Sequence, residues 1–171
     1  MIFADIESPI GLLRIVEDEG ALRSLDTVKH RTFDTRPCGE PGQSALLKRC
    51  ARQLEEYFAG ARATFDLPLR LEGTAFQQRV WQALLTIPFG ETRSYAEQAR
   101  AIGRPTATRA VGAANGRNPI SIIVPCHRVI GSDGSLTGYA GGEPTKRWLL
   151  THEGGTARGP QLDSWQAVAN P

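Results

Sequence analysis

Apolar and polar positions alternate through the first 28 residues of the chain, which predicts short strands with one buried face. The predicted strands cover residues 2–7, 11–17 and 21–28. Residues 29–43 are rich in proline and glycine and predict a loop. The pattern then changes to a helical one over residues 45–59, with Ser44 as the N-cap and Gly60 just past the end.

Three further helices are expected between Gly73 and Ala114. Thr74 to Gln77 is a capping box that begins a helix with one apolar stripe, and Pro88 stops this helix. Ser94 to Glu97 is a second capping box and opens a short helix that ends near Gly103. Pro105 is expected to open the next helix, which runs to about Ala114, because proline suits a first helical turn. Two short helices around a tight glycine-containing turn predict a helix-turn-helix.

A β-branched run, Ile120 to Val124, predicts a buried strand that ends at Pro125, because proline cannot donate to a ladder. Cys126 and His127 follow directly, where a rigid element gives way to a turn. Residues 131–142 contain five glycines and predict a loop. Pro144 is expected to begin a last helix that ends at the sequence His152-Glu-Gly-Gly155.

These elements predict an α+β protein of two domains. A small N-terminal domain with an antiparallel sheet and a helix covers residues 1–72, and a mostly helical, winged-helix-like domain with the helix-turn-helix covers residues 73–155. Residues 156–171 lack periodicity and are expected to form a loose tail. Acidic residues interrupt the apolar N-terminus, so neither a signal peptide nor a membrane span is expected, and a cytoplasmic protein is predicted.

Charge is distributed unevenly along the chain. Residues 1–72 carry ten basic and twelve acidic side chains, whereas residues 73–171 carry ten basic and six acidic ones. Between Thr92 and Asn118 there is one carboxylate, Glu97, against five arginines: Arg93, Arg100, Arg104, Arg109 and Arg117. This favours an anionic partner, although a solvated basic face would look the same. The second helix of the helix-turn-helix adds a face of small residues (Ala107, Ala110, Ala113 and Ala114), which suits either close approach to DNA or tight internal packing.

Cys126 is the candidate nucleophile. The chain has three cysteines and three histidines without the spacing of a zinc site, and an odd cysteine count fits a reducing compartment. A plain core cysteine is disfavoured because His127 and Arg128 are polar groups that favour the reactive thiolate. Adjacent residues on extended backbone point apart, so a bridging water is the expected proton path to His127, and Glu153 is the expected orienting carboxylate. Such a relay fits hydrolysis or alkyl transfer, and general principles do not choose between them.

Residues 125–129 (Pro-Cys-His-Arg-Val) resemble the active-site signature of the O6-alkylguanine-DNA alkyltransferases, or methylated-DNA–protein-cysteine methyltransferases. The resemblance extends in order through residues 74–155. It includes Ile87-Pro88-Phe-Gly-Glu-Thr92, Ser94-Tyr95, Arg109-Ala-Val-Gly112, Asn118-Pro119 and Gly138-Tyr139, and it ends at Glu153.

The resemblance implies direct reversal of DNA damage. The alkyl group of O6-alkylguanine, or less readily O4-alkylthymine, would pass to Cys126 in a single turnover that inactivates the protein. His127 would deprotonate Cys126 through a water, Glu153 would orient His127, and Asn118 would hold the active-site turn. Tyr95 would crowd the 3′ phosphate and hydrogen-bond N3 of the flipped base, and Arg109 would fill the gap in the duplex. The remaining implied residues are Arg104 and the small-residue face for DNA binding, and Tyr139, Ala140, Val129, Ser121 and Asn115 for the pocket.

Three departures from the family pattern stand out. Ser121 occupies a position where some members carry a pocket proline, which bears on bulky O6-benzyl groups, and Ala140 replaces a serine found in others. The Cys and His ligands of the zinc site that some members carry are not evident, so neither a metal nor a cofactor is expected. The expected partner is double-stranded DNA bearing O6-alkylguanine, with no membrane partner, and the protein is expected to be a monomer in solution that can cluster on DNA.

Three rival functions remain to be weighed. An alkyltransferase-like protein, which binds damage without repairing it, would lack the acceptor cysteine that is present here. A DNA-binding regulator could use the same helix-turn-helix. A cysteine hydrolase would turn over and would not need Arg109 or the small-residue face.

Overall fold

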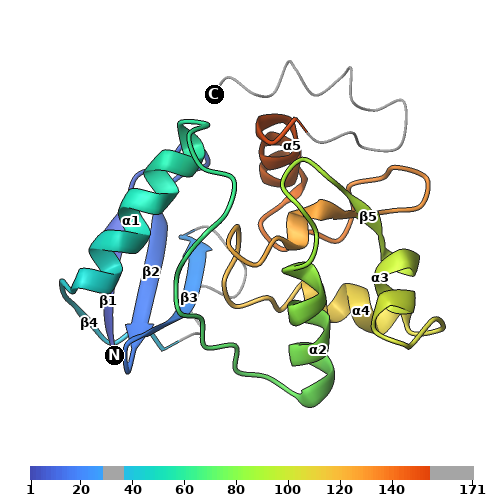
Figure 1. The fold of residues 1–171 in the computed structure, drawn as a ribbon, viewed down its shortest axis with the longest axis horizontal. Helices are drawn as coiled ribbons and strands as arrows, with labels where there is room; N and C mark the ends of the chain where they lie inside the picture. Colours follow the sequence, from blue (N-terminus) through green and yellow to red (C-terminus); the bar gives the residue numbers. More distant parts are fainter. Residues whose placement is uncertain (29–36, 155–171) are drawn as a thin grey trace. The chain divides into compact units, whose positions relative to one another are not determined.

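The computed structural model describes residues 1–28 and 37–154, and it divides them into two compact units. The first unit contains Met1–Glu72 together with Pro119–Ile123, and the second contains Gly73–Asn118 and the chain from Val124 onward (Figure 1). The main division falls between Glu72 and Gly73, and residues 119–123 belong to the first unit although they lie within the chain of the second. The tail predicted at 156–171 lies outside the described residues.

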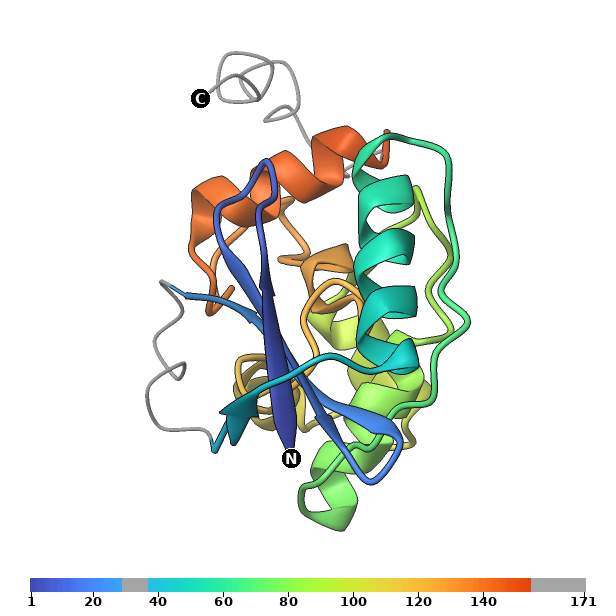
Figure 2. The ribbon, with the colours of Figure 1, turned by 90° about the vertical axis from the view of Figure 1, so that its left-hand side faces the viewer.

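The first unit is a four-stranded sheet with one helix beside it. The strands β1 (Ile2–Ile6), β2 (Leu13–Asp18) and β3 (Ala21–Thr27) pair antiparallel in sequence order, as predicted. The two-residue strand β4 (Glu40–Pro41), within the stretch predicted as loop, adds parallel to β1 at the edge. The helix α1 (Ala45–Phe58) lies against β1 and β2 (Figure 2), and Ser44 caps it by accepting the Leu47 N–H at 3.0 Å.

The second unit is mostly helical, which confirms the predicted fold class. Its elements are α2 (Ala75–Leu84), β5 (Arg93–Ser94), α3 (Tyr95–Ala101), α4 (Thr108–Asn115), the 3₁₀ helix η2 (Cys126–Arg128), β6 (Val129–Ile130) and α5 (Glu143–His152). Both predicted capping boxes are present, at Thr74 with Gln77 and at Ser94 with Glu97. The short strands β5 and β6 pair in parallel, and this pairing brings the start of α3 beside the chain that leaves η2.

The strand predicted at Ile120–Val124 is wrong. All five residues are buried, but they form turns, and only Ile120 makes an isolated bridge, to Leu25. Ile122 has φ +73°, a conformation that a β-branched residue rarely adopts, and the Ile123 N–H closes a three-residue turn on the Ser121 carbonyl at 2.9 Å. A continuous apolar run reports burial, whereas the backbone conformation depends on hydrogen-bond partners elsewhere in the fold.

The expected start of the second helix of the helix-turn-helix is also wrong. Helix α4 begins at Thr108, and Pro105 lies inside the preceding turn. The Ala107 N–H donates to the Arg104 carbonyl at 2.9 Å, which closes a turn around the proline. Proline tolerates a turn as well as a first helical turn, because in both places its missing N–H is not needed.

Candidate active site

Cys126 is held on a tight turn that is tied down by Asn118. Pro125 has φ −84° and ψ 65°, the values of an inverse γ-turn, and the Cys126 N–H donates to the Val124 carbonyl at 2.9 Å. The Asn118 Nδ2 donates to the same Val124 carbonyl at 2.7 Å and to Cys126 Sγ at 3.1 Å. Cys126 as a whole residue is 6 % exposed. One amide therefore fixes the backbone of the turn and supplies a hydrogen-bond donor that favours a thiolate.

His127, Arg128 and Glu153 form a buried cluster behind the turn. The His127 ring is fully buried, and its Nε2 lies 2.8 Å from Glu153 Oε1. Arg128 donates two hydrogen bonds to the same carboxylate, from Nε to Oε2 at 2.8 Å and from Nη2 to Oε1 at 2.9 Å. Its Nη1 donates to the Ile87 carbonyl at 2.7 Å. Glu153 follows the last residue of α5, so this cluster ties the end of α5 to η2.

The charges of this cluster set the tautomer of His127. Burial by itself raises the pKa of Glu153, but the hydrogen bonds from His127 and Arg128 and the charge of Arg128 outweigh it and hold the pKa below its usual range. Burial lowers the pKa of His127 despite the raising effect of Glu153, so the imidazole is neutral at pH 7. A neutral ring facing a carboxylate donates its Nε2–H, which leaves Nδ1 as the basic nitrogen. Among the described residues, the buried Nδ1 has no hydrogen-bond partner.

The half-buried Tyr95 and the fully buried Lys146 form a second pair in the same unit. Tyr95 is the first residue of α3, and its hydroxyl donates to the Thr137 carbonyl at 3.0 Å. Lys146 on α5 is fully buried, and its Nζ donates to the Val129 carbonyl and, at 3.5 Å, to the Tyr95 hydroxyl. Burial lowers the pKa of Lys146 to about 8, while the charge of Cys126 opposes this shift. Burial raises the pKa of Tyr95 to about 12, and the charge of Cys126 adds to this shift.

Helix α4 presents part of its expected DNA face to solvent. Arg109, Ala110 and Ala113 are exposed, as is Arg104 in the preceding turn, and Ala107 is half-buried. Ala114 and Asn115 lie on the opposite, buried side of the helix. The carbonyl of Ala114 accepts the Trp81 Nε1–H at 2.9 Å. The small-residue face is therefore split, with some alanines facing solvent and Ala114 serving internal packing.

Two of the expected pocket residues are engaged in hydrogen bonds with residues outside the expected pocket. Val129 follows η2 directly, and Tyr139 and Ala140 lie half-buried in the loop before α5. Asn115 is engaged with Gln98 inside the helical unit. Ser121 belongs to the first unit, where its hydroxyl donates to Asp26 Oδ1 at 2.8 Å. The structure therefore brings Cys126, His127, Glu153 and Asn118 together, and it places Asn115 and Ser121 in other hydrogen bonds.

Two members of the site were missed by the sequence reasoning. Neither Lys146 nor the two hydrogen bonds from Arg128 to Glu153 were singled out, because lysine and arginine are usually exposed and these two find their partners only through the tertiary fold. The alignment of Lys146 with the buried positions of α5, Leu149 and Leu150, is the one pattern that could have found it.

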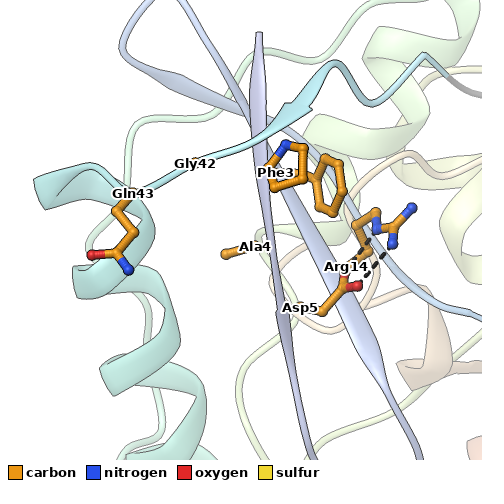
Figure 3. A pocket seen from close by; sticks show the side chains of 7 residues that line it. Phe3, Ala4, Asp5, Arg14, Gly42 and Gln43 are labelled. Carbon is orange, nitrogen blue, oxygen red and sulfur yellow. Dashed lines mark hydrogen bonds and ion pairs between the residues drawn. The ribbon is translucent and has the colours of Figure 1, made fainter.

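A pocket of about 660 Å³ lies on the first unit, near the start of β1 and the chain before α1 (Figure 3). Arg14 in this pocket donates twice to Asp5, at 2.7 Å each, and its guanidinium lies 4.0 Å from the centre of the Phe3 ring. The charges satisfy each other, which makes this surface a poor active site. Within residues 1–28 and 37–154, no cluster of His, Cys, Asp and Glu could hold a metal ion. No helix in the described part of the chain is long and apolar enough to cross a membrane.

Comparison with known proteins matches both units of the chain. Residues 1–71 match the family model of the 6-O-methylguanine DNA methyltransferase ribonuclease-like domain, and residues 75–155 match that of its DNA binding domain. The methylated-DNA–protein-cysteine methyltransferase of Methanosarcina barkeri is 52% identical over 153 residues, which cover 90% of this chain and 97% of that protein. A crystal structure of Mycobacterium tuberculosis OGT in complex with DNA matches with a TM-score of 0.84 and 48% identity, over 97% of this chain and 99% of that chain.

The two-unit fold and the cysteine site define a DNA-repair transferase. The chain belongs to the family of methylated-DNA–protein-cysteine methyltransferases. A third relative, the constitutive enzyme of Bacillus subtilis, is 48% identical over 155 residues, which cover 88% of this chain and 94% of that protein.

Proposed function

We propose that the protein removes alkyl groups from guanine O6 in duplex DNA, and less readily from thymine O4, by transferring them once to its own Cys126. The observation that carries this proposal is the contact of His127 Nε2 with Glu153 Oε1 at 2.8 Å, from which we infer that Nε2 carries the hydrogen and that Nδ1 is the basic nitrogen available to the thiol. Cys126 and His127 are neighbours on η2, and a single water between Nδ1 and Sγ supplies the proton path.

Each charged group around His127 has a part in this proton transfer. When Cys126 loses its proton, the proton ends on Nδ1, and the imidazolium is stabilised by the carboxylate of Glu153 at 2.8 Å. Arg128 keeps that carboxylate ionised through its two bonds. Glu153 therefore orients and stabilises His127 without taking the proton itself. Asn118, 3.1 Å from Sγ, stabilises the resulting thiolate.

The thiolate then attacks the alkyl carbon, the bond from carbon to O6 breaks, and its electron pair goes to the departing guanine. We assign Tyr95 to the departure of the base: its O–H turns from the Thr137 carbonyl to N3 of guanine and gives its proton to N3, so that the base leaves as a neutral molecule. The Tyr95 oxygen then carries the negative charge, and Lys146 Nζ, which donates to this oxygen at 3.5 Å, stabilises it. The carbonyl of Val129 already accepts from Lys146, and its second lone pair can accept the exocyclic amine of guanine.

The target base must leave the stack to reach the thiol of Cys126, a residue that is 6 % exposed. Unstacking and unpairing cost about a few kcal/mol. The exposed side of α4 is the proposed contact with DNA, with Ala110 and Ala113 allowing close approach in the minor groove and Arg109 filling the gap. Arg104 is placed to contact phosphate, Tyr95 to crowd the 3′ phosphate, and Tyr139 with the Ala140 N–H to wall the pocket.

The product of the transfer is a thioether, which no base in the site can reverse. The protein therefore acts once per molecule. The proposal also takes it to be a monomer that can cluster on DNA, in the cytoplasm and without a metal or cofactor. This stoichiometry separates the proposal from a cysteine hydrolase, which would release its product and turn over.

The deciding experiment is an intact-mass measurement after incubation with a duplex that contains O6-methylguanine. We expect one methyl group per molecule, on the peptide that holds Cys126, and no further reaction after one equivalent of damage. Cys126→Ser serves as the control that binds DNA and gains no mass. Repeated turnover, a methyl group on another peptide, or binding without a mass change would overturn the proposal.

A further inference from the structure

Helix α4 has little apolar surface with which to hold its orientation. Its buried residues are Val111, Ala114 and Asn115, so Val111 is the one branched apolar side chain on the inner side. Ridges of large side chains are what normally set the rotation and crossing angle of packed helices. With Val111 and Ala114 as its only buried apolar side chains, α4 has few apolar contacts that oppose a rotation about its own axis, and such a rotation would change which residues it exposes.

Polar bonds hold the inner side of α4. Gln98 on α3 and Asn115 at the end of α4 are both buried, and their side-chain amides bond to each other in both directions. Gln98 Nε2 donates to Asn115 Oδ1 at 3.1 Å, and Asn115 Nδ2 donates to Gln98 Oε1 at 2.8 Å. Gln98 Nε2 also lies 3.4 Å from the Val80 carbonyl of α2. The amide pair therefore joins the three helices at one point.

The geometry of these two hydrogen bonds matters because it restricts how α4 can be rotated. An amide pair with two antiparallel bonds has one geometry, whereas a few small apolar contacts permit several, and a buried polar pair is a known means of selecting one packing among several. Arg109 and Ala113 lie on the side of α4 opposite to Val111 and Asn115, so the same geometry determines where they point.

We propose that the Gln98–Asn115 amide pair is a positioning element for DNA repair, which sets the rotation of α4 and so aims Arg109 and Ala113 at the duplex. This inference rests on the proposed function, because it takes the exposed side of α4 as the DNA contact. It assigns the pair no role in the chemistry at Cys126. Loss of the pair should therefore impair reaction with damage in duplex DNA and spare the reaction with free O6-methylguanine base.

The test compares two double variants with the wild type. Gln98→Met with Asn115→Leu removes both amides together and keeps similar volumes, so no buried amide is left unpaired and the unfolding midpoint should stay close to that of the wild type. We expect its single-turnover rate on duplex DNA to fall roughly ten- to a hundredfold, with its rate on the free base unchanged. Gln82→Met, an exposed position on α2, is the matched control and should leave both rates unchanged.

The second double variant exchanges the residues, as Gln98→Asn with Asn115→Gln, which keeps both amides and their combined length. Each single exchange should lower the duplex rate, and the double exchange should restore it. This arm decides the matter even where the apolar variant does not fold. A stable apolar variant with a normal duplex rate, or an exchange variant no better than its singles, would overturn the inference while the wild type still takes one methyl per molecule. A wild type that takes none would overturn the proposed function as well.

Discussion

Glu153→Gln is the most informative single change in the site, because this side chain is bonded to two buried neighbours. Its carboxylate accepts from His127 Nε2 at 2.8 Å and from Arg128 at 2.8 and 2.9 Å. All three residues are at most 6 % exposed. The glutamine keeps the shape but removes the negative charge, and one of its two ends becomes an NH₂ group facing a donor.

The cost can be worked from these contacts. Removing one partner of a buried ion pair leaves the other charge, here Arg128, uncompensated and typically costs about 3–5 kcal/mol. A hydrogen bond to a charged group contributes about 1.5–3 kcal/mol, so the loss of one or two of the three bonds gives a similar sum. With a urea dependence of about 2 kcal/mol/M, the midpoint should fall by roughly 1.5–2.5 M. The rate of methyl transfer should fall by roughly 10²–10⁴, because His127 loses the group that stabilises its protonated form.

The assay is urea unfolding at pH 7, with single-turnover methyl transfer measured on the folded fraction. Glu143→Gln is the matched control, since Glu143 lies at the other end of α5, is exposed and pairs with Arg147. An exposed pair of this kind contributes about 0.3–0.5 kcal/mol. If Glu153→Gln costs no more stability than Glu143→Gln, then Glu153 does not hold the buried cluster together. If it leaves the rate unchanged, then Glu153 does not stabilise protonated His127.

Three further outcomes are expected. Arg109→Ala should lower the rate on duplex DNA by roughly tenfold or more, because the Arg109 side chain that fills the gap in the duplex offsets part of the cost of flipping the base. The rate on free O6-methylguanine should stay unchanged, and equal losses on both substrates would contradict the role of Arg109. The pKa of Lys146 is lowered from 10.5 to about 8, so between these pH values the unfolded chain binds more protons than the folded one, and this group makes the free energy of unfolding rise with pH. Lys146→Met should abolish that part of the rise in urea unfolding measured from pH 8 to 10. An unchanged dependence of the free energy of unfolding on pH would contradict the lowered pKa of Lys146. Gly73→Ala should lower the free energy of unfolding by about 1–3 kcal/mol, because the new Cβ would lie 2.6 Å from the Trp81 ring. The control Gly116→Ala would place its Cβ 3.6 Å from the nearest atoms and should cost far less. Equal thermal midpoints for the two variants would refute the steric argument.

Local signals in the sequence were reliable guides to the ends of most helices. Ser44, Thr74 and Ser94 each cap the helix that the sequence predicted, because a cap depends on residues at most three positions apart. Pro105 misled the prediction, since a proline fits both a turn and a first helical turn, and only the fold distinguishes them. The apolar run from Ile120 to Val124 correctly indicated burial and wrongly indicated a strand.

The site could be predicted in part for the same reason. Cys126 and His127 are adjacent in the sequence, and Pro125 before them marks a turn, so their presentation was visible locally. The contact between His127 and Glu153 spans 26 residues and was proposed from the order of the residues alone; the structure places the two atoms 2.8 Å apart. The hydrogen bonds that Arg128 donates to the same carboxylate were not predicted.

The sequence by itself determined the fold class, the capped helices, the helix-turn-helix and the cysteine with its histidine, because these depend on composition, periodicity and neighbours along the chain. The tertiary structure alone decided the turn at Ile122, the burial of Lys146, the fork of Arg128 on Glu153 and the pairing of Gln98 with Asn115. Each of these is a polar group or backbone conformation that is unfavourable alone and is stabilised by a partner distant in sequence. Such partners meet only when the chain folds, so no local pattern encodes them.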